Sequence, residues 1–201
     1  MSHDMHRKAR ARMPFVPALA GLAACRDQEI VVTTMGAARE WPKLSSHPLD
    51  FHYLPSTMGQ APLVALGLAL AQPGREVICL NGDGCMLMNL GALVTIRAAA
   101  AVNLTLVVMD NGLYEVTGGQ QTVAAVAQTD FAGFARAAGW PSVLEFDTLD
   151  DWQVAAPKLT EAPGPRFVVL HVEPIGPAYQ LPSLGPMSER IAKFRQALGV
   201  A

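Results

Sequence analysis

The feature that most constrains the fold of this chain is an alternation between short β-branched apolar runs and longer segments with helical periodicity. Such runs are typical of strands buried in a parallel sheet, and the segments between them supply crossover helices. The predicted strands are residues 29–34, 50–54, 76–80, 103–109, 142–146 and 166–172. The predicted helices are residues 15–25, 37–41, 59–71, 86–100, 130–138 and 149–159. The pattern predicts an α/β fold with a doubly wound, mostly parallel sheet of about six strands and helices on both faces.

Two of the helical segments carry further expectations. Pro42 is expected to end the helix at 37–41, because proline lacks the N–H that would continue the hydrogen-bond ladder. Segment 59–71 is apolar almost all round, so that helix is expected to be buried on every side.

The length of 201 residues suits one substantial domain rather than two. We expect residues 1–201 to form a single domain, with residues 1–13 flexible and residues 174–201 forming a C-terminal arm. The arm would comprise a proline-rich loop at 174–186 and a short helix at 188–198. Hydrophobic residues make up 51% of the chain and charged residues only 16%, against roughly 25% in average proteins. This balance indicates apolar surface that is covered in an oligomer.

Charge and cysteine content exclude several classes of protein. A formal net charge of -2 without a basic stripe argues against a nucleic-acid partner. Three scattered cysteines without CxxC spacing argue against a structural zinc or iron–sulfur site and favour a reducing, cytoplasmic location. Segment 15–25 follows several basic residues, as in a signal peptide, but Pro14 and Pro17 are typical of the start of an ordinary helix. No apolar run reaches the roughly 20 residues of a membrane span, so no membrane partner is expected.

Two polar loops follow predicted strands that we expect to end at the same edge of the sheet, where ligands bind in open α/β folds. Asp83 lies between Gly82 and Gly84, where backbone amides and a helix N-terminus can approach a phosphate group. Asn111 follows the strand at 103–109. Taken singly, Asp83 is an ordinary helix cap and Asn111 an ordinary turn residue. Taken together, these oxygen ligands and a backbone carbonyl just after Asn111 suit a magnesium ion that carries a diphosphate.

The pair resembles the signature of thiamine diphosphate enzymes, in which Gly-Asp-Gly is followed, after a helix and a strand, by asparagine. Segments 82–96 and 110–120 are similar to those of sulfopyruvate and phosphonopyruvate decarboxylases. The tail of the second segment, Thr117 to Gln120, singles out this subgroup. The resemblance implies a thiamine diphosphate-binding fold, thiamine diphosphate and Mg2+ as cofactors, and Asp83, Asn111 and the Leu113 carbonyl as metal ligands.

The same resemblance implies roles for further residues. Met58 would hold the cofactor in a bent shape, a task that suits an unbranched thioether, although a plain core methionine is the alternative. The carbonyl of Ser56 would accept a hydrogen bond from the aminopyrimidine, and the backbone N–H groups of Gly84 and Cys85 would bind the diphosphate. Cys85 stands where relatives usually carry serine or alanine, so we interpret it as a small residue rather than a nucleophile.

Gly82 and Tyr114 complete the expected cofactor-binding set. Glu115 is expected near the thiazolium ring, where it would be either a substrate-facing acid or base or an ordinary loop glutamate. The main catalytic glutamate of the family belongs to a pyrimidine-binding domain, for which the 201 residues have no room. The resemblance therefore implies a cofactor-binding β-type subunit that needs an α-type partner.

We expect a homodimer of this chain within a hetero-oligomer that decarboxylates a small 2-oxo acid. Two alternatives are also compatible with the sequence. Acetolactate synthase-like subunits use the same chemistry for carboligation, and a non-catalytic thiamine diphosphate-binding domain would keep only the fold. The 2-oxo acid:ferredoxin oxidoreductases also have separate cofactor-binding chains, but their clustered cysteines are missing from this sequence.

Overall fold

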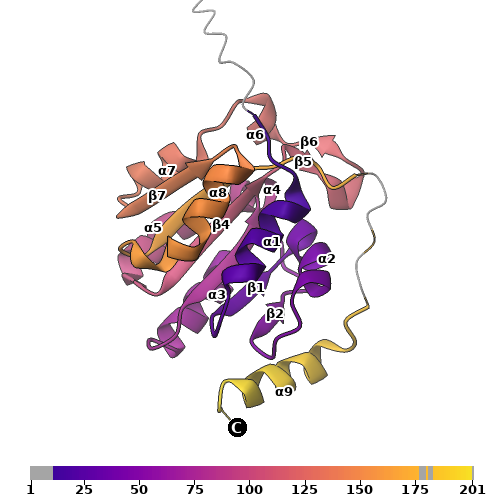
Figure 1. The fold of residues 1–201 in the computed structure, drawn as a ribbon, viewed down its shortest axis with the longest axis vertical. Coiled ribbons are helices and arrows are strands. Elements are labelled where there is room, and N and C mark those ends of the chain that lie inside the picture. The colour runs from indigo at the N-terminus through magenta and orange to yellow at the C-terminus, as the bar shows by residue number, and fades with distance from the viewer. Residues whose placement is uncertain (1–10, 177–179, 181–182, 201) are drawn as a thin grey trace, which may run out of the picture.

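The computed structural model describes residues 11–176, 180 and 183–200, and its centre is a six-stranded sheet (Figure 1). The strands are β1 (Ile30–Thr33), β2 (Asp50–His52), β3 (Val77–Gly82), β4 (Leu104–Asp110), β7 (Ser142–Phe146) and β8 (Arg166–His171). They lie in the order β2-β1-β3-β4-β8-β7, and every neighbouring pair is parallel. The predicted fold class is confirmed.

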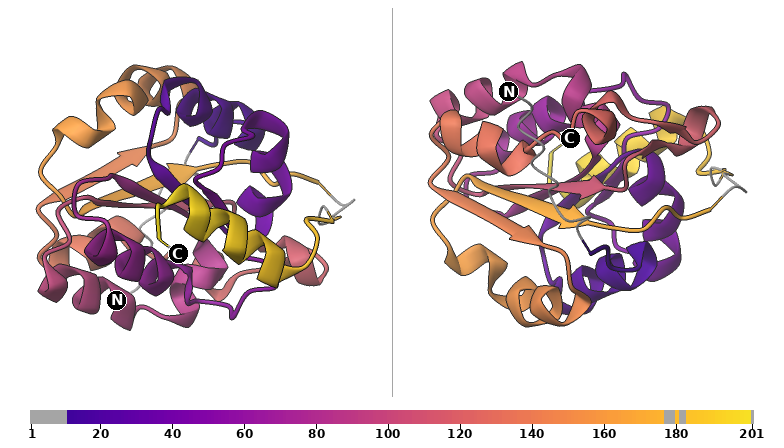
Figure 2. Two further views of the ribbon diagram at one scale, coloured as in Figure 1. Left: turned by 90° about the horizontal axis from the view of Figure 1, so that it is seen from below. Right: turned by 90° about the horizontal axis from the view of Figure 1, so that it is seen from above.

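Helices cover both faces of the sheet, which is seen edge-on between them in Figure 2. One face packs against α1 (Phe15–Cys25), α2 (Met35–Leu44), α8 (Leu149–Ala155) and the 3-10 helix η2 (Ala156–Glu161). The other face packs against α3 (Ala61–Ala71), α5 (Gly91–Ala99) and α7 (Phe131–Ala137). Because the central strands are covered twice, β4 and β8 are buried along nearly their whole length, which explains their unbroken apolar runs.

Three helix predictions are wrong in detail. Pro42 lies inside α2, which continues to Leu44. A proline near the C-terminus of a helix removes only its own N–H from the hydrogen-bond ladder. The Ser45 N–H therefore still donates to the Trp41 carbonyl at 2.9 Å. The helix predicted at 86–100 is two helices, α4 (Asp83–Met88) and α5, separated where Asn89 leaves helical geometry. Helix α3 is not buried on every side, since Leu70 is 55% exposed.

A short hairpin and one helix after β4 are not predicted by the sequence pattern. The hairpin consists of β5 (Leu113–Tyr114), the 3-10 helix η1 (Glu115–Thr117) and β6 (Gln120–Gln121), and α6 (Val123–Val126) follows it. These elements have between two and four residues, which is too short for a periodicity to be recognised.

Residues near both ends of the described part of the chain pack onto the sheet. Met13 is buried and pairs with Val172, so the predicted flexible segment 1–13 includes a residue of the fold, whereas 1–10 lie outside the described residues. Helix α9 (Met187–Ala197) lies within the range predicted as a C-terminal arm and places Phe194 against Phe51, with ring centroids 5.0 Å apart. Residues 177–179 and 181–182 of the arm are also outside the described part. Arg190 of α9 donates to the carbonyl of His52 at 2.6 Å and to that of Leu54.

Candidate functional site

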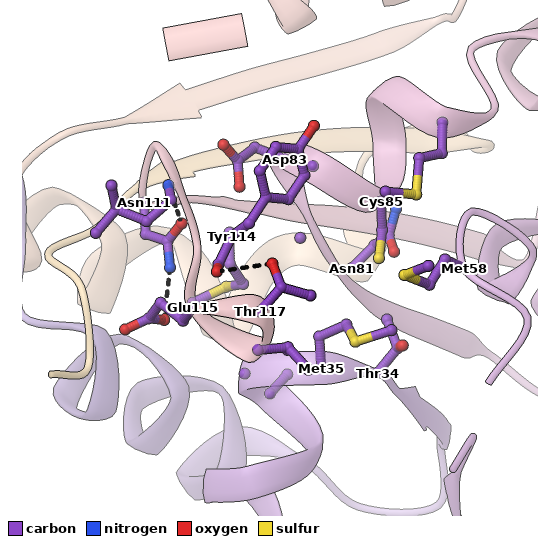
Figure 3. A pocket seen from close by; sticks show the side chains of 18 of the residues that line it. Thr34, Met35, Met58, Asn81, Asp83, Cys85, Asn111, Tyr114, Glu115 and Thr117 are labelled. Atoms are coloured by element: carbon purple, nitrogen blue, oxygen red, sulfur yellow. Dashed lines mark hydrogen bonds between the residues drawn. The ribbon is translucent and has the colours of Figure 1, made fainter. Parts of the chain in front are cut away.

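A cleft of about 240 Å³ opens at the C-terminal edge of the sheet, where β1, β3 and β4 end (Figure 3). The neighbours β1 and β3 lie at a topological switch point, because the chain leaves β1 toward β2 on one side and leaves β3 toward β4 on the other. Ligands of doubly wound folds bind at such points. The volume is slightly below that of typical ligand pockets, which measure roughly 300–1,000 Å³.

The cleft gathers nearly all of the site residues that the sequence predicts. Those that line it are Met58, Gly82, Asp83, Gly84, Cys85, Asn111, Leu113, Tyr114 and Glu115. Ser56 is half-buried in the loop before Met58 and is not among the lining residues. In the view of Figure 3, Asn111 and Glu115 lie across the cleft from Met58 and Cys85.

Asp83 is a buried carboxylate without a described cationic partner. It begins α4 directly after β3, is 2% exposed, and accepts a hydrogen bond from Thr122 Oγ1 at 3.0 Å. Burial and, secondly, the charge of Asp110 raise the pKa of Asp83 to about 6. Within the described part of the chain, no lysine, arginine or histidine forms an ion pair with it. A bound cation would therefore stabilise its ionised form.

Asn111 has a fixed orientation in the turn after β4. Its Oδ1 accepts the backbone N–H of Leu113 at 2.9 Å, and its Nδ2 donates to Glu115 Oε2 at 2.7 Å. The next residue, Gly112, has a φ of 74°, a conformation that favours glycine. A carboxamide oxygen has two lone pairs, so Oδ1 keeps one for a further ligand.

Two helices begin at the cleft, and their first turns line it. Helix α2 contributes Met35, Gly36 and Ala37 after β1, and α4 contributes Asp83, Gly84 and Cys85 after β3. Backbone N–H groups and the positive dipole ends at the starts of two helices suit a multiply charged anion such as a diphosphate. The described residues contain no group of three or more His, Cys, Asp or Glu side chains that could hold a metal by themselves. A metal here would need amide and carbonyl oxygens and its ligand's own oxygens.

Comparison with known protein families gives a match over most of the chain. Residues 23–172 match the family described as "Thiamine pyrophosphate enzyme, C-terminal TPP binding domain". The chain belongs to this family.

Several relatives at 35–40% identity are named as decarboxylases, and two acetolactate synthase large subunits match at 27–28% identity. Phosphonopyruvate decarboxylase of Streptomyces viridochromogenes is 37% identical over 83% of this chain and 42% of that protein, so this chain spans less than half of it. Sulfopyruvate decarboxylase subunit beta of Methanothermobacter thermautotrophicus is 36% identical over 79% of this chain and 82% of that protein. The crystal structure of benzoylformate decarboxylase from Polynucleobacter necessarius shares the fold, with a TM-score of 0.63 and 20% identity over 84% of this chain and 35% of that one.

The wall of this thiamine pyrophosphate-binding domain opposite Asn111 is apolar and partly open. Met58 and Met88 line the cleft and are about half exposed at its mouth, at 51% and 49%. Cys85 is buried beside them, and burial raises its thiol pKa, so it remains a protonated thiol rather than a reactive thiolate. This agrees with its interpretation as a small residue.

The ring of Tyr114 packs directly over Gly84. A Cβ atom on Gly84 would overlap that ring, which explains why the second glycine of the Gly-Asp-Gly turn cannot carry a side chain here. The first glycine, Gly82, has open space around it, so packing alone does not require a glycine there.

The sequence analysis missed three polar residues at the site. Thr34 lines the cleft at the end of β1, and the first βα turn of a doubly wound fold was the signal for it. Asn81 also lines the cleft, and its buried Oδ1 accepts no hydrogen bond from the described residues, which leaves a polar atom for a ligand to satisfy. Thr122 reaches Asp83 from the start of α6, and no local sequence signal marks it.

No helix of the described chain is both long and apolar enough to cross a membrane.

Proposed function

We infer that this chain is the cofactor-binding, β-type subunit of a thiamine diphosphate- and Mg2+-dependent 2-oxo acid decarboxylase. The observation that carries the proposal is the buried Asp83 carboxylate, which lacks a described cationic partner and lies in the same cleft as Asn111 and two helix N-termini. A divalent ion with a diphosphate would neutralise this carboxylate and occupy the helix N-termini together.

The residues of the cleft fit such a group. Asp83, Asn111 Oδ1 and the Leu113 carbonyl would hold the magnesium ion, and the backbone N–H groups of Gly84 and Cys85 would bind the diphosphate. Gly82 and Tyr114 would shape the turn and the wall beside that diphosphate. The chemistry that thiamine diphosphate supplies when bound is nucleophilic attack on a carbonyl carbon and uptake of the electron pair released with CO2.

Other residues would orient the cofactor and exclude water. Met58 lies at the mouth of the cleft, where its flexible thioether would support the two rings of the cofactor. The Ser56 carbonyl would reach the aminopyrimidine, although Ser56 is not among the residues that line the cleft. This role therefore needs a movement of the loop that carries both residues.

We propose that the glutamate that activates the aminopyrimidine comes from a separate, pyrimidine-binding chain of α type. Glu115 is the one glutamate among the described lining residues, and both of its carboxylate oxygens already accept hydrogen bonds. The exposed Met58, Met88 and Val116 at the mouth would be covered by that chain. We further propose a homodimer of this subunit within the hetero-oligomer, and a cytoplasmic location that suits the free thiols of all three cysteines.

The proposed substrate is a small 2-oxo acid. The described residues that line the cleft include two acids, Asp83 and Glu115, and no lysine, arginine or histidine. A cation that binds the acid group of the substrate would therefore belong to the α-type chain. This charge distribution supports a site shared between two chains.

Isothermal titration with thiamine diphosphate tests the proposal, with and without MgCl2, on this chain alone and after addition of a pyrimidine-domain subunit. We expect Mg2+-dependent binding that appears or tightens with the second chain. Absence of binding in every combination would refute the proposal. Product analysis of the complex with a 2-oxo acid separates release of CO2 and an aldehyde from the carboligation product of an acetolactate synthase-like enzyme.

A further inference from the structure

Glu115 makes more hydrogen bonds than a surface loop glutamate needs. Its Oε2 accepts from Asn111 Nδ2 at 2.7 Å, and its Oε1 accepts the backbone N–H groups of Ile175 at 2.7 Å and Gly176 at 3.2 Å. The carboxylate thus joins the loop after β4 to the segment after β8. Hydrogen bonds to a charged acceptor are roughly twice as strong as neutral ones, so this is a firm tether.

These bonds determine which way the Asn111 carboxamide faces. The Leu113 N–H can only donate and the Glu115 carboxylate can only accept, so Oδ1 must face Leu113 and Nδ2 must face Glu115. A rotation of the amide by 180° would place two donors together on one side and two acceptors on the other. Glu115 therefore keeps the Asn111 oxygen on the side of the amide away from itself.

The tether also reaches the wall formed by α2. The side chain of Ile175 lies close to Gly36, because a Cβ atom on Gly36 would be 3.2 Å from Ile175 Cδ1. Glu115 thus holds three parts of the cleft in one arrangement: the turn after β4, the segment after β8 and the first turn of α2.

We propose that Glu115 is a positioning residue that orients the Asn111 carboxamide toward the metal and thereby sets the Mg2+ dependence of cofactor binding. The inference rests on the proposed function and differs from an acid–base role, because Glu115 acts here by orienting a metal ligand through hydrogen bonds and transfers no proton to the substrate. Partners that orient metal ligands typically contribute roughly 10- to 100-fold in metal affinity.

The test compares Glu115→Gln with the wild-type chain in thiamine diphosphate titrations at a series of MgCl2 concentrations, with the pyrimidine-domain chain present. The amide oxygen of Gln at position 115 keeps the most hydrogen bonds when it accepts the backbone N–H groups of Ile175 and Gly176. Its Nε2 then faces Asn111 Nδ2, and the hydrogen bond between positions 115 and 111 is lost because both groups are donors. We expect the half-saturating Mg2+ concentration to rise by about 10-fold or more. Glu173→Gln removes the same charge from an exposed position near Ile175 and is expected to leave the Mg2+ dependence unchanged.

A second variant uses the direction of the hydrogen bond. When Asn111→Asp is combined with Glu115→Gln, the new amide at position 115 would donate to a carboxylate at position 111, which also accepts the Leu113 N–H. We expect the double variant to regain much of the lost Mg2+ affinity. A double variant that binds no better than Glu115→Gln would contradict the orientation argument.

The outcomes separate this inference from the proposed function. If the wild-type chains bind no thiamine diphosphate at any Mg2+ concentration, both are overturned. If the wild type binds but Glu115→Gln keeps the wild-type Mg2+ dependence and instead lowers kcat with an altered pH profile, only the positioning role is overturned. Circular dichroism and the unfolding temperature of each variant exclude loss of fold as the cause.

Discussion

Replacing Asp83 by its neutral isostere is expected to stabilise the cofactor-free chain while removing its response to the cofactor. Asp83 is 2% exposed and its pKa is raised to about 6, chiefly by burial. The folded chain therefore favours the protonated form of the Asp83 carboxyl group, although the group is ionised at neutral pH. Asp83→Asn keeps the shape and removes the buried charge.

The magnitude follows from the shift in pKa. At roughly 1.36 kcal/mol per pKa unit, a rise from 3.8 to about 6 means that ionised Asp83 lowers the stability of the cofactor-free fold by roughly 3 kcal/mol. The asparagine loses about 1–2 kcal/mol of this gain, because its amide nitrogen, a donor, replaces an oxygen in a site where Thr122 Oγ1 and two backbone N–H groups already donate. The net stabilisation is about 1–2 kcal/mol, or a rise in Tm of roughly 2–8 °C for a chain of this size.

The contribution of the Asp83 carboxyl group to folding stability depends on pH in one direction. A carboxyl group whose folded pKa is raised contributes stability below its unfolded pKa, and this contribution is lost as the pH rises through about 6. Asp83→Asn is therefore expected to have a higher Tm than the wild type at about pH 8 and a lower Tm near pH 4, where the cost of the buried charge is small and the lost hydrogen bonding remains. Thermal unfolding in EDTA at both pH values measures this difference, and the exposed Asp147→Asn serves as the control that changes charge without a buried site.

The second half of the prediction uses MgCl2 and thiamine diphosphate together with the pyrimidine-domain chain. The wild-type chain is expected to gain stability from them at about pH 8, because binding to the folded state raises Tm, and Asp83→Asn is expected to gain little. A variant that is less stable than the wild type without cofactor at that pH would refute the account of the buried charge. A variant that responds to magnesium like the wild type would refute Asp83 as a metal ligand.

Further substitutions test the supports of the cleft. Arg190→Met removes hydrogen bonds to the carbonyl of His52 and to the loop that follows it, so we expect a loss of about 1–3 kcal/mol in urea unfolding and weaker cofactor binding, with the exposed Lys193→Met as control. Gly84→Ala is expected to displace the aromatic ring above it and to weaken thiamine diphosphate binding in calorimetry. Gly67→Ala, in an open position of α3, is expected to raise stability by about 0.5–1 kcal/mol, and equal effects of the two alanines would contradict the packing argument.

Most of the candidate site was predictable because its residues directly follow strands. Asp83 and Asn111 stand at the ends of β3 and β4, and in a parallel sheet neighbouring strands bring such positions to one edge. Met58 was predicted through its family resemblance and lines the cleft, whereas Ser56, two residues earlier, does not. A loop of this kind has no periodicity that would determine the direction of each side chain.

Glu115 illustrates what position in the sequence leaves undecided. Its place in the loop after Asn111 allowed either an acid–base role or an ordinary loop glutamate, and neither alternative included a tether. The bonds to Ile175 and Gly176 join residues about 60 positions apart. Only the packing of the segment after β8 against the turn after β4 brings these groups together.

The sequence by itself determined the parallel α/β architecture and the two polar turns, because both depend on local properties: the periodicity of apolar residues, β-branched runs and glycine turns. The tertiary structure decided the contact of Thr122 with Asp83, the tether of Glu115 and the docking of α9 through Arg190, which span 39, 60 and 138 residues of sequence. Such contacts depend on how complete helices and strands pack in space. The sequence around a hydrogen-bond acceptor does not identify the distant donor that will bind it.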